Sequence, residues 1–237
     1  MLYRAAMPRV PRKLSLLPNH AVHKVWRGHN REWNLGTDGQ KALYLQFMND
    51  DLESTKYKNA STLNALTLMS NHTHEVVRVE EPKLFSNHMR RHHSRYGSHF
   101  NRANNRCGKV AQDRPHTTLL EEEHSEMEVV LYVHANPIRA KIVKDLRNYR
   151  WSTHKLYAFG KKEAWMRNVK LPKWYLKLGK TPSQRQKSYR RLFATYLKEK
   201  GCVKQSFLRK RFFGTIPWVD SHEVLVKEWR KAHAPPS

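Results

Sequence analysis

The chain has few cysteines and no long apolar run. Its 237 residues include two cysteines, Cys107 and Cys202, whose positions do not form a paired metal-binding spacing. No apolar stretch approaches the roughly 20 residues that a membrane-spanning helix needs. The basic N-terminus is not followed by the apolar core of a secretory signal. These absences favour a reduced, cytoplasmic protein without a membrane anchor.

Acidic residues are also scarce. Lys and Arg number 45 against 20 Asp and Glu, so the formal net charge is +25. Such a field attracts polyanions and repels other copies of the chain. Nucleic acid is the expected partner, and an anionic membrane surface is the alternative. Because the basic residues are spread along the whole chain rather than along one amphipathic helix, the first interpretation is favoured.

The order of the expected elements indicates an α+β fold. Hydrophobic patterns predict strands at 22–26, 62–69, 72–79 and within 109–120, and helices at 38–48, 82–104 and 122–135. Asn136-Pro137 is expected to end the last helix. A βαββαβ order predicts a ferredoxin-like domain with an antiparallel sheet, here assigned to residues 1–158.

Residues 159–237 are predicted to form a basic helical C-terminal extension. Thr181-Pro182 begins a capping-box pattern, Gly201 is expected to end that helix, and a further basic helix is expected at 205–213. Basic residues heavily outnumber acidic ones in this extension. It is expected to contact DNA, and a solvated helical cap on the first domain is the alternative.

His72 and His74 are the candidate metal ligands. They stand two apart at the start of an expected strand, so their imidazoles point to the same face. Two imidazoles on one spot can bind a divalent cation. The alternative is a pair of ordinary polar residues at the end of a hairpin.

Tyr96 lies on the apolar stripe of the 82–104 helix. If that helix packs across the sheet, its phenol could approach the histidines and attack a phosphodiester, forming a covalent phosphotyrosine while the metal offsets developing charge. An ordinary core tyrosine is the alternative. Asn101 is the candidate third ligand, with His93 and His99 as further candidates on the same helix.

In sequence order, several segments resemble the single-tyrosine HUH transposases, in particular the REP-associated tyrosine transposases of bacteria. The similar segments are Met7-Pro8-Arg9, 23–30 with Arg27-Gly28, 68–74 ending in His72-Thr73-His74, Arg95-Tyr96, Phe100-Asn101, Arg114, 132–140 with Asn136-Pro137, and 149–152. The extension around 178–193 is similar to that of longer members.

The resemblance implies a metal-dependent DNA strand transferase that nicks and joins single-stranded hairpin DNA through a 5′-phosphotyrosine, with Mg or Mn and often as a dimer. In that interpretation Tyr96 is the nucleophile, and His72, His74 and Asn101 bind the metal. Arg27, Arg95 and Arg114 contact DNA; for Arg27, which begins a turn rich in hydrogen-bond donors, a solvated loop is the alternative.

Three positions depart from the family pattern. Ser70 stands where the family has proline, Thr73 where it has a bulky apolar residue, and Glu75 where it has an aliphatic one. The ligands are kept but their support is weakened. An inactivated or domesticated copy that binds structured nucleic acid without cleavage is therefore the alternative function, and an RNA-associated basic protein is a third.

Overall fold

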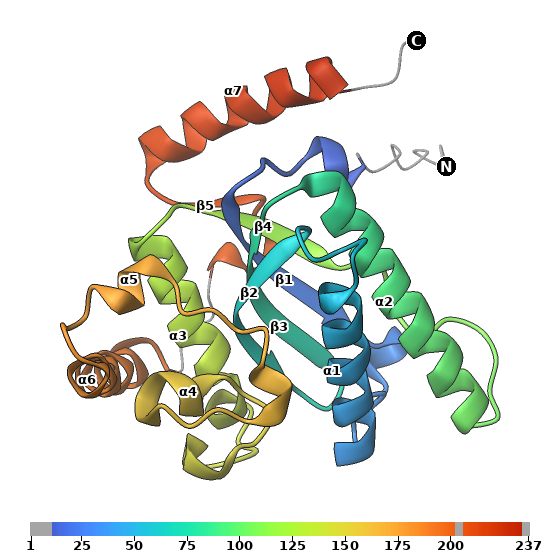
Figure 1. The fold of residues 1–237 in the computed structure, drawn as a ribbon, viewed down its shortest axis with the longest axis horizontal. Coiled ribbons are helices and arrows are strands. Elements are labelled where there is room, and N and C mark those ends of the chain that lie inside the picture. Colours follow the sequence, from blue (N-terminus) through green and yellow to red (C-terminus); the bar gives the residue numbers. More distant parts are fainter. Residues whose placement is uncertain (1–10, 202–205, 234–237) are drawn as a thin grey trace, which may run out of the picture.

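The computed structural model describes residues 11–201 and 206–233. Met7-Pro8-Arg9 and Cys202 lie outside them. The fold is α+β, as predicted, and centres on a mostly antiparallel sheet with the strand order β2-β3-β1-β4-β5 (Figure 1). The strands are β1 (His20–Arg27), β2 (Ser61–Leu68), β3 (His72–Val79), β4 (His116–Leu120) and β5 (Phe212–Phe213).

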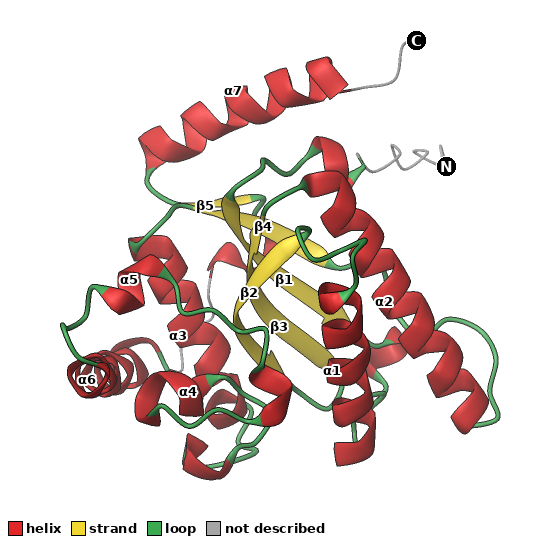
Figure 2. Ribbon diagram, in the orientation of Figure 1, coloured by secondary structure: helices red, strands yellow, loops and turns green. Residues whose placement is uncertain are grey.

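Helices cover both faces of the sheet (Figure 2). Helices α1 (Asp38–Glu53) and α2 (Pro82–Ala103) lie on one face, and α3 (His124–Arg139) lies on the other. Beyond α3 come α4 (His154–Phe159), α5 (Lys173–Leu176) and α6 (Pro182–Lys200), while α7 (Ile216–His233) packs near the short turn η1 (Arg12–Leu14). The other short turns are η2 (His29–Arg31), η3 (Leu146–Asn148), η4 (Ala164–Met166) and η5 (Ser206–Arg209). No helix of the described residues is both long and apolar enough to cross a bilayer.

Helix α3 does not end at Asn136-Pro137, so that prediction is wrong. Proline cannot donate a hydrogen bond to the carbonyl four residues earlier, which usually breaks a helix. Here the side-chain Nδ2 of Asn136 donates to the carbonyls of Tyr132 (3.0 Å) and Val133 (3.3 Å). The bond to Val133 satisfies the carbonyl that Pro137 leaves free, and the helix continues to Arg139.

The prediction of a helix at 205–213 is also wrong for the residues of that range that the structure describes. A 3₁₀ turn, η5, is followed by β5, which pairs in parallel with the end of β4. Phe207 and Phe212 are buried in the main core. Burying these aromatic rings against the sheet outweighs the local preference for a helix.

The pleat of β3 divides its side chains between two environments. His72 and His74 face α3, whereas Thr73 and Glu75 face α1 and α2. The Glu75 carboxylate lies 2.6 Å from the ammonium of Lys24, and both side chains are 2% exposed. The hydroxyls of Thr73 and Tyr44 donate to the same carboxylate, at 3.0 and 3.2 Å. The unusual Glu75 is therefore a satisfied structural residue.

Replacing Glu75 by Leu should lower the free energy of unfolding by about 3–5 kcal/mol, because it leaves the Lys24 ammonium buried and unpaired. Urea denaturation would measure the loss. The double variant Lys24→Met/Glu75→Leu should recover most of it, and Glu53→Gln, at an exposed ion pair on α1, should have little effect. Equal losses for Glu75→Leu and the double variant would contradict the paired arrangement.

Candidate functional site

His72 and His74 lie together on the α3 face of the sheet, as the two-residue spacing predicted. Their ring centroids are 5.0 Å apart, with the ring planes nearly perpendicular. Arg27 of β1 pairs with His72 in the strand register, so its side chain leaves the sheet on the same face. His72 and Arg27 are half-buried, and His74 is 3% exposed.

Neighbouring side chains hold both imidazoles through Nδ1. Nδ1 of His72 lies 2.6 Å from Oδ1 of Asn71, and Nδ1 of His74 lies 3.0 Å from Nε2 of His23. Neither bond uses Nε2 of His72 or His74. A metal-binding imidazole usually has this arrangement, with one ring nitrogen hydrogen-bonded and the other directed at the metal. If His74 donates its Nδ1 proton, the buried Nδ1 of His23 carries a proton without a partner.

Burial keeps these rings neutral. It lowers the pKa of His72 to about 4 and that of His23 to about 3, and it lowers the pKa of His74 well below its usual value. The charge of Arg27 adds to the effect at His72 and His74. Neutral imidazole is the form that binds a metal, so the protonation state fits the predicted ligand role.

Tyr132 of α3 contacts one member of the histidine pair, His74. Its ring packs edge-on against His74, with 5.4 Å between ring centroids, and lies 6.2 Å from His23. Phe207 covers it at 5.1 Å, and the guanidinium of Arg139 lies 5.3 Å from its ring centre. The side chain is only 5% exposed.

Opposing effects act on the phenol of Tyr132. Burial raises its pKa, while the charges of Arg139 and Arg27 and a hydrogen bond from the Asn136 side chain lower it; the net direction is upward. Asn136 lies one helical turn after Tyr132, on the same side of α3. Two arginines, an amide and two imidazoles therefore surround one tyrosine.

Tyr96 does not approach the histidines, so the predicted convergence is wrong. Its ring is 1% exposed and packs against Trp26 and Tyr44, with centroids at 5.9 and 5.2 Å. Trp26 pairs with Thr73, which places this cluster on the face opposite His74. The Tyr96 hydroxyl donates to the carbonyl of Asn34, and burial raises its pKa.

The candidate third ligands on α2 also lie away from His72 and His74. The amide of Asn101 donates to the carbonyl of Gly108, His93 stacks on Trp26, and His99 packs against Phe47. No three His, Cys, Asp or Glu residues within the described part of the chain lie close enough to hold a metal ion. A third protein ligand at His72 and His74 would have to be of another type, and Asn136 carries an amide on α3 one turn after Tyr132.

The three arginines expected to contact DNA have different surroundings. Arg27 lies beside His72. Arg95 donates to the Asp51 carboxylate of α1 at 2.7 Å and lies 4.2 Å above the Phe47 ring, on the α1–α2 side. Arg114 is exposed in the segment just before β4. The structure therefore brings Arg27, and not Arg95, to the histidine face.

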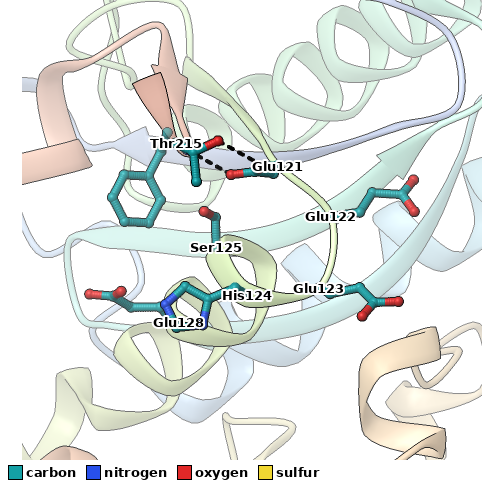
Figure 3. Close-up of a pocket in the computed structure, with 9 residues that line it drawn as sticks. Glu121, Glu122, Glu123, His124, Ser125, Glu128 and Thr215 are labelled. Carbon is teal, nitrogen blue, oxygen red and sulfur yellow. Dashed lines mark hydrogen bonds between the residues drawn. The ribbon is translucent and has the colours of Figure 1, made fainter. Parts of the chain in front are cut away.

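A separate acidic pocket of about 460 Å³ lies where β4 leads into α3 (Figure 3). Its carboxylates already have partners in the protein. Glu121 accepts from the backbone and hydroxyl of Thr215, Glu123 pairs with Lys177, and Glu128 pairs with Lys200 at 2.8 Å. These carboxylates are therefore part of the packing around α3, and the pocket is separate from the histidine site.

No protein-family model and no curated protein sequence matches the chain. Among solved structures, one described as a REP-associated tyrosine transposase bound to a REP hairpin is similar in fold, with a TM-score of 0.50. The alignment covers 62% of this chain and 84% of that one, at 19% sequence identity. At that identity the similarity shows a shared fold.

The low histidine pKa values predict acid sensitivity. Burial lowers the pKa of His88 and His154 to about 4, as it does for His72. The unfolded chain therefore binds protons between about pH 6.5 and 4 that the folded protein does not. Each group should cost roughly 2 kcal/mol of unfolding free energy from pH 7 to pH 5, seen as a falling urea midpoint.

A matched variant isolates one group. Both ring nitrogens of His88 are buried without a partner, so His88→Leu removes a titrating group and loses no hydrogen bond. Its midpoint should fall less between pH 7 and pH 5 than that of the parent protein. Equal midpoints for the parent protein at the two pH values would contradict the assignment.

Proposed function

We propose that the chain nicks and joins single-stranded hairpin DNA, with Tyr132 rather than Tyr96 as nucleophile. The observation that carries this proposal is the packing of the Tyr132 ring against His74, on the face that also bears His72. Resemblance in sequence and similarity in fold both support a DNA-processing role. The strand order β2-β3-β1-β4 with antiparallel neighbours supports a ferredoxin-like assignment of the sheet domain.

The reaction would proceed by direct displacement at phosphorus. The phenolic oxygen of Tyr132 forms a bond to the phosphorus while the bond to the 3′ oxygen breaks. The phenol gives up its proton and the departing oxygen gains one, which leaves a 3′ hydroxyl and a 5′-phosphotyrosine. Attack by another 3′ hydroxyl reverses the step and joins a strand without external energy.

Residues around Tyr132 supply positioning and charge. Nε2 of His72 and of His74, with the amide oxygen of Asn136, would hold Mg or Mn, which when bound offsets charge on a phosphate oxygen. Arg27 and Arg139 would bind phosphate and lower the pKa of the phenol. Arg27 extends from β1 beside His72, and the Arg139 guanidinium lies 5.3 Å from the Tyr132 ring centre.

A second candidate function is binding of structured nucleic acid without cleavage. The burial of Tyr132 beneath Phe207 favours it, because a nucleophile must be reached by the phosphate it attacks. A net charge of +25 supports binding in either case. Dimer formation remains a prediction from the family resemblance.

Incubating the protein with a labelled single-stranded hairpin and Mn²⁺ should give a covalent adduct on a denaturing gel. Tyr132→Phe should abolish the adduct, because it removes the attacking oxygen, and His72→Ala or His74→Ala should reduce it at least about 100-fold. Tyr96→Phe, the matched control, should retain it. An adduct that survives Tyr132→Phe but not Tyr96→Phe would overturn this assignment, and binding without any adduct would favour the second function.

Arg27→Met should weaken hairpin binding roughly three- to tenfold and lower the slope of log affinity against log salt by about 0.7–0.9, since one phosphate contact is lost. Arg95→Met is the control, because its guanidinium pairs with Asp51 on the other side of the sheet. Fluorescence anisotropy over a salt series would measure both. Equal weakening by the two variants would show that the histidine face is not the binding face.

A further inference from the structure

Trp33 is an exposed indole in a chain that buries most of its aromatic rings. Trp33 is 73% exposed. Of the large apolar side chains that are exposed in the described residues, only this one is aromatic. The remaining exposed ones are aliphatic: Ile142, Leu176, Ile216, Val224 and Leu225. An isolated exposed apolar residue needs no explanation, but several hydrogen bonds fix the backbone around Trp33.

The loop that carries Trp33, residues 28–35, is bonded to the turn that precedes His72. The amide of Gly28 donates to the carbonyl of Asn71, and the amide of Leu35 donates to the carbonyl of Ser70, both at 2.8 Å. The side chain of Asn71 donates back to the carbonyl of Arg31 at 3.0 Å. The same Asn71 accepts from His72, so the loop and the histidine share an anchor.

The other side of the loop is anchored from α2 and Val110. Asn34, next to Trp33, is fully buried; its amide donates to the carbonyl of Val110 at 3.0 Å, and its own carbonyl accepts from Tyr96. A Cβ at Gly28 would lie 2.7 Å from the Asn34 amide, so the loop folds tightly on itself. The Asn34 side chain, through its bond to Val110, therefore holds this side of the loop independently of the Tyr96 hydroxyl.

The loop also contains backbone in an unfavourable region. Asn30 and Arg31 both have positive φ, 49° and 60°, which asparagine tolerates and arginine rarely adopts. Strain of this kind persists where surrounding contacts fix it, and it often accompanies binding sites. Here it holds Arg31 and Trp33 at the surface, with the half-buried His29 beside them.

From these contacts we propose that Trp33 stacks on an unpaired base of the DNA strand that enters the histidine site. An exposed indole is a platform for any base, while Arg27, His29 and Arg31 provide positive or hydrogen-bonding groups for the adjoining phosphates. The anchored loop supplies this platform with little loss of conformational freedom on binding. The inference rests on the proposed binding of single-stranded DNA at this face.

The test compares the binding of a DNA strand that has bases with the binding of a strand that has only the sugar-phosphate backbone. A 20-nucleotide thymidine strand and an abasic strand of the same length carry the same backbone charge, and Tyr132→Phe serves as the parent in each assay to prevent a covalent step. Trp33→Leu in that parent should weaken binding of the thymidine strand at least fivefold and leave binding of the abasic strand unchanged. Trp33→Phe should retain most of the affinity, because a phenyl ring still stacks.

Ile216→Ala on α7 is the matched control for loss of an exposed apolar side chain, at 78% exposure, and should bind both strands as the parent does. Quenching of tryptophan fluorescence by the thymidine strand should also decrease in Trp33→Phe. Equal affinity of Trp33→Leu and the parent for the thymidine strand would overturn the role of Trp33. Failure of the parent to bind either strand would overturn the proposed function together with it.

Discussion

The two-residue period of strand β3 is the constraint on which the site depends. One strand sends His72 and His74 to the α3 side and Thr73 and Glu75 to the α1–α2 side. A group that acts together with the histidines must lie on the α3 side of the sheet. A group that stabilises Glu75 must lie on the α1–α2 side. The chain meets both conditions, with Tyr132 and Asn136 on α3 and with Lys24 and Tyr44 opposite.

The polar groups of the α1–α2 side form a structural network rather than a reaction site. Lys24, Glu75, Thr73 and Tyr44 satisfy one another, and the ring of His92 lies 2.9 Å from the carbonyl of Tyr44. A buried network of this kind holds the sheet and the two helices in one arrangement. The depressed pKa of each buried histidine has the same cause, namely removal of the charged form from water.

Much of the fold could be predicted from the sequence. The strand-forming run 72–79 and the capping pattern that begins at Thr181 act through local geometry, and the structure contains those elements. The continuation of α3 past Pro137 could not be predicted as easily, because it depends on two hydrogen bonds from one amide. The strand at Phe212–Phe213 depends on the edge of a sheet formed almost 100 positions earlier.

The site was predicted only in part for a related reason. The spacing of His72 and His74 fixes their common face, but sequence periodicity does not state which helix covers that face. Tyr96 and Tyr132 are both buried tyrosines on helices, and tertiary packing places them on opposite faces of the sheet. A signal was nevertheless present, since Tyr132 precedes Asn136 by one helical turn within the segment that resembles the transposase motifs.

The pairing of β5 with β4 has a consequence for solubility. Without Phe212 and Phe213, the outer backbone groups at Leu119 and Leu120 would be open to pairing with another molecule. At the opposite margin, bridges from Val169 and Ser152 shield part of β2. Both margins of the sheet are thus protected by segments that follow α3, so a shortened chain that retains every proposed site residue would tend to aggregate through its exposed strands.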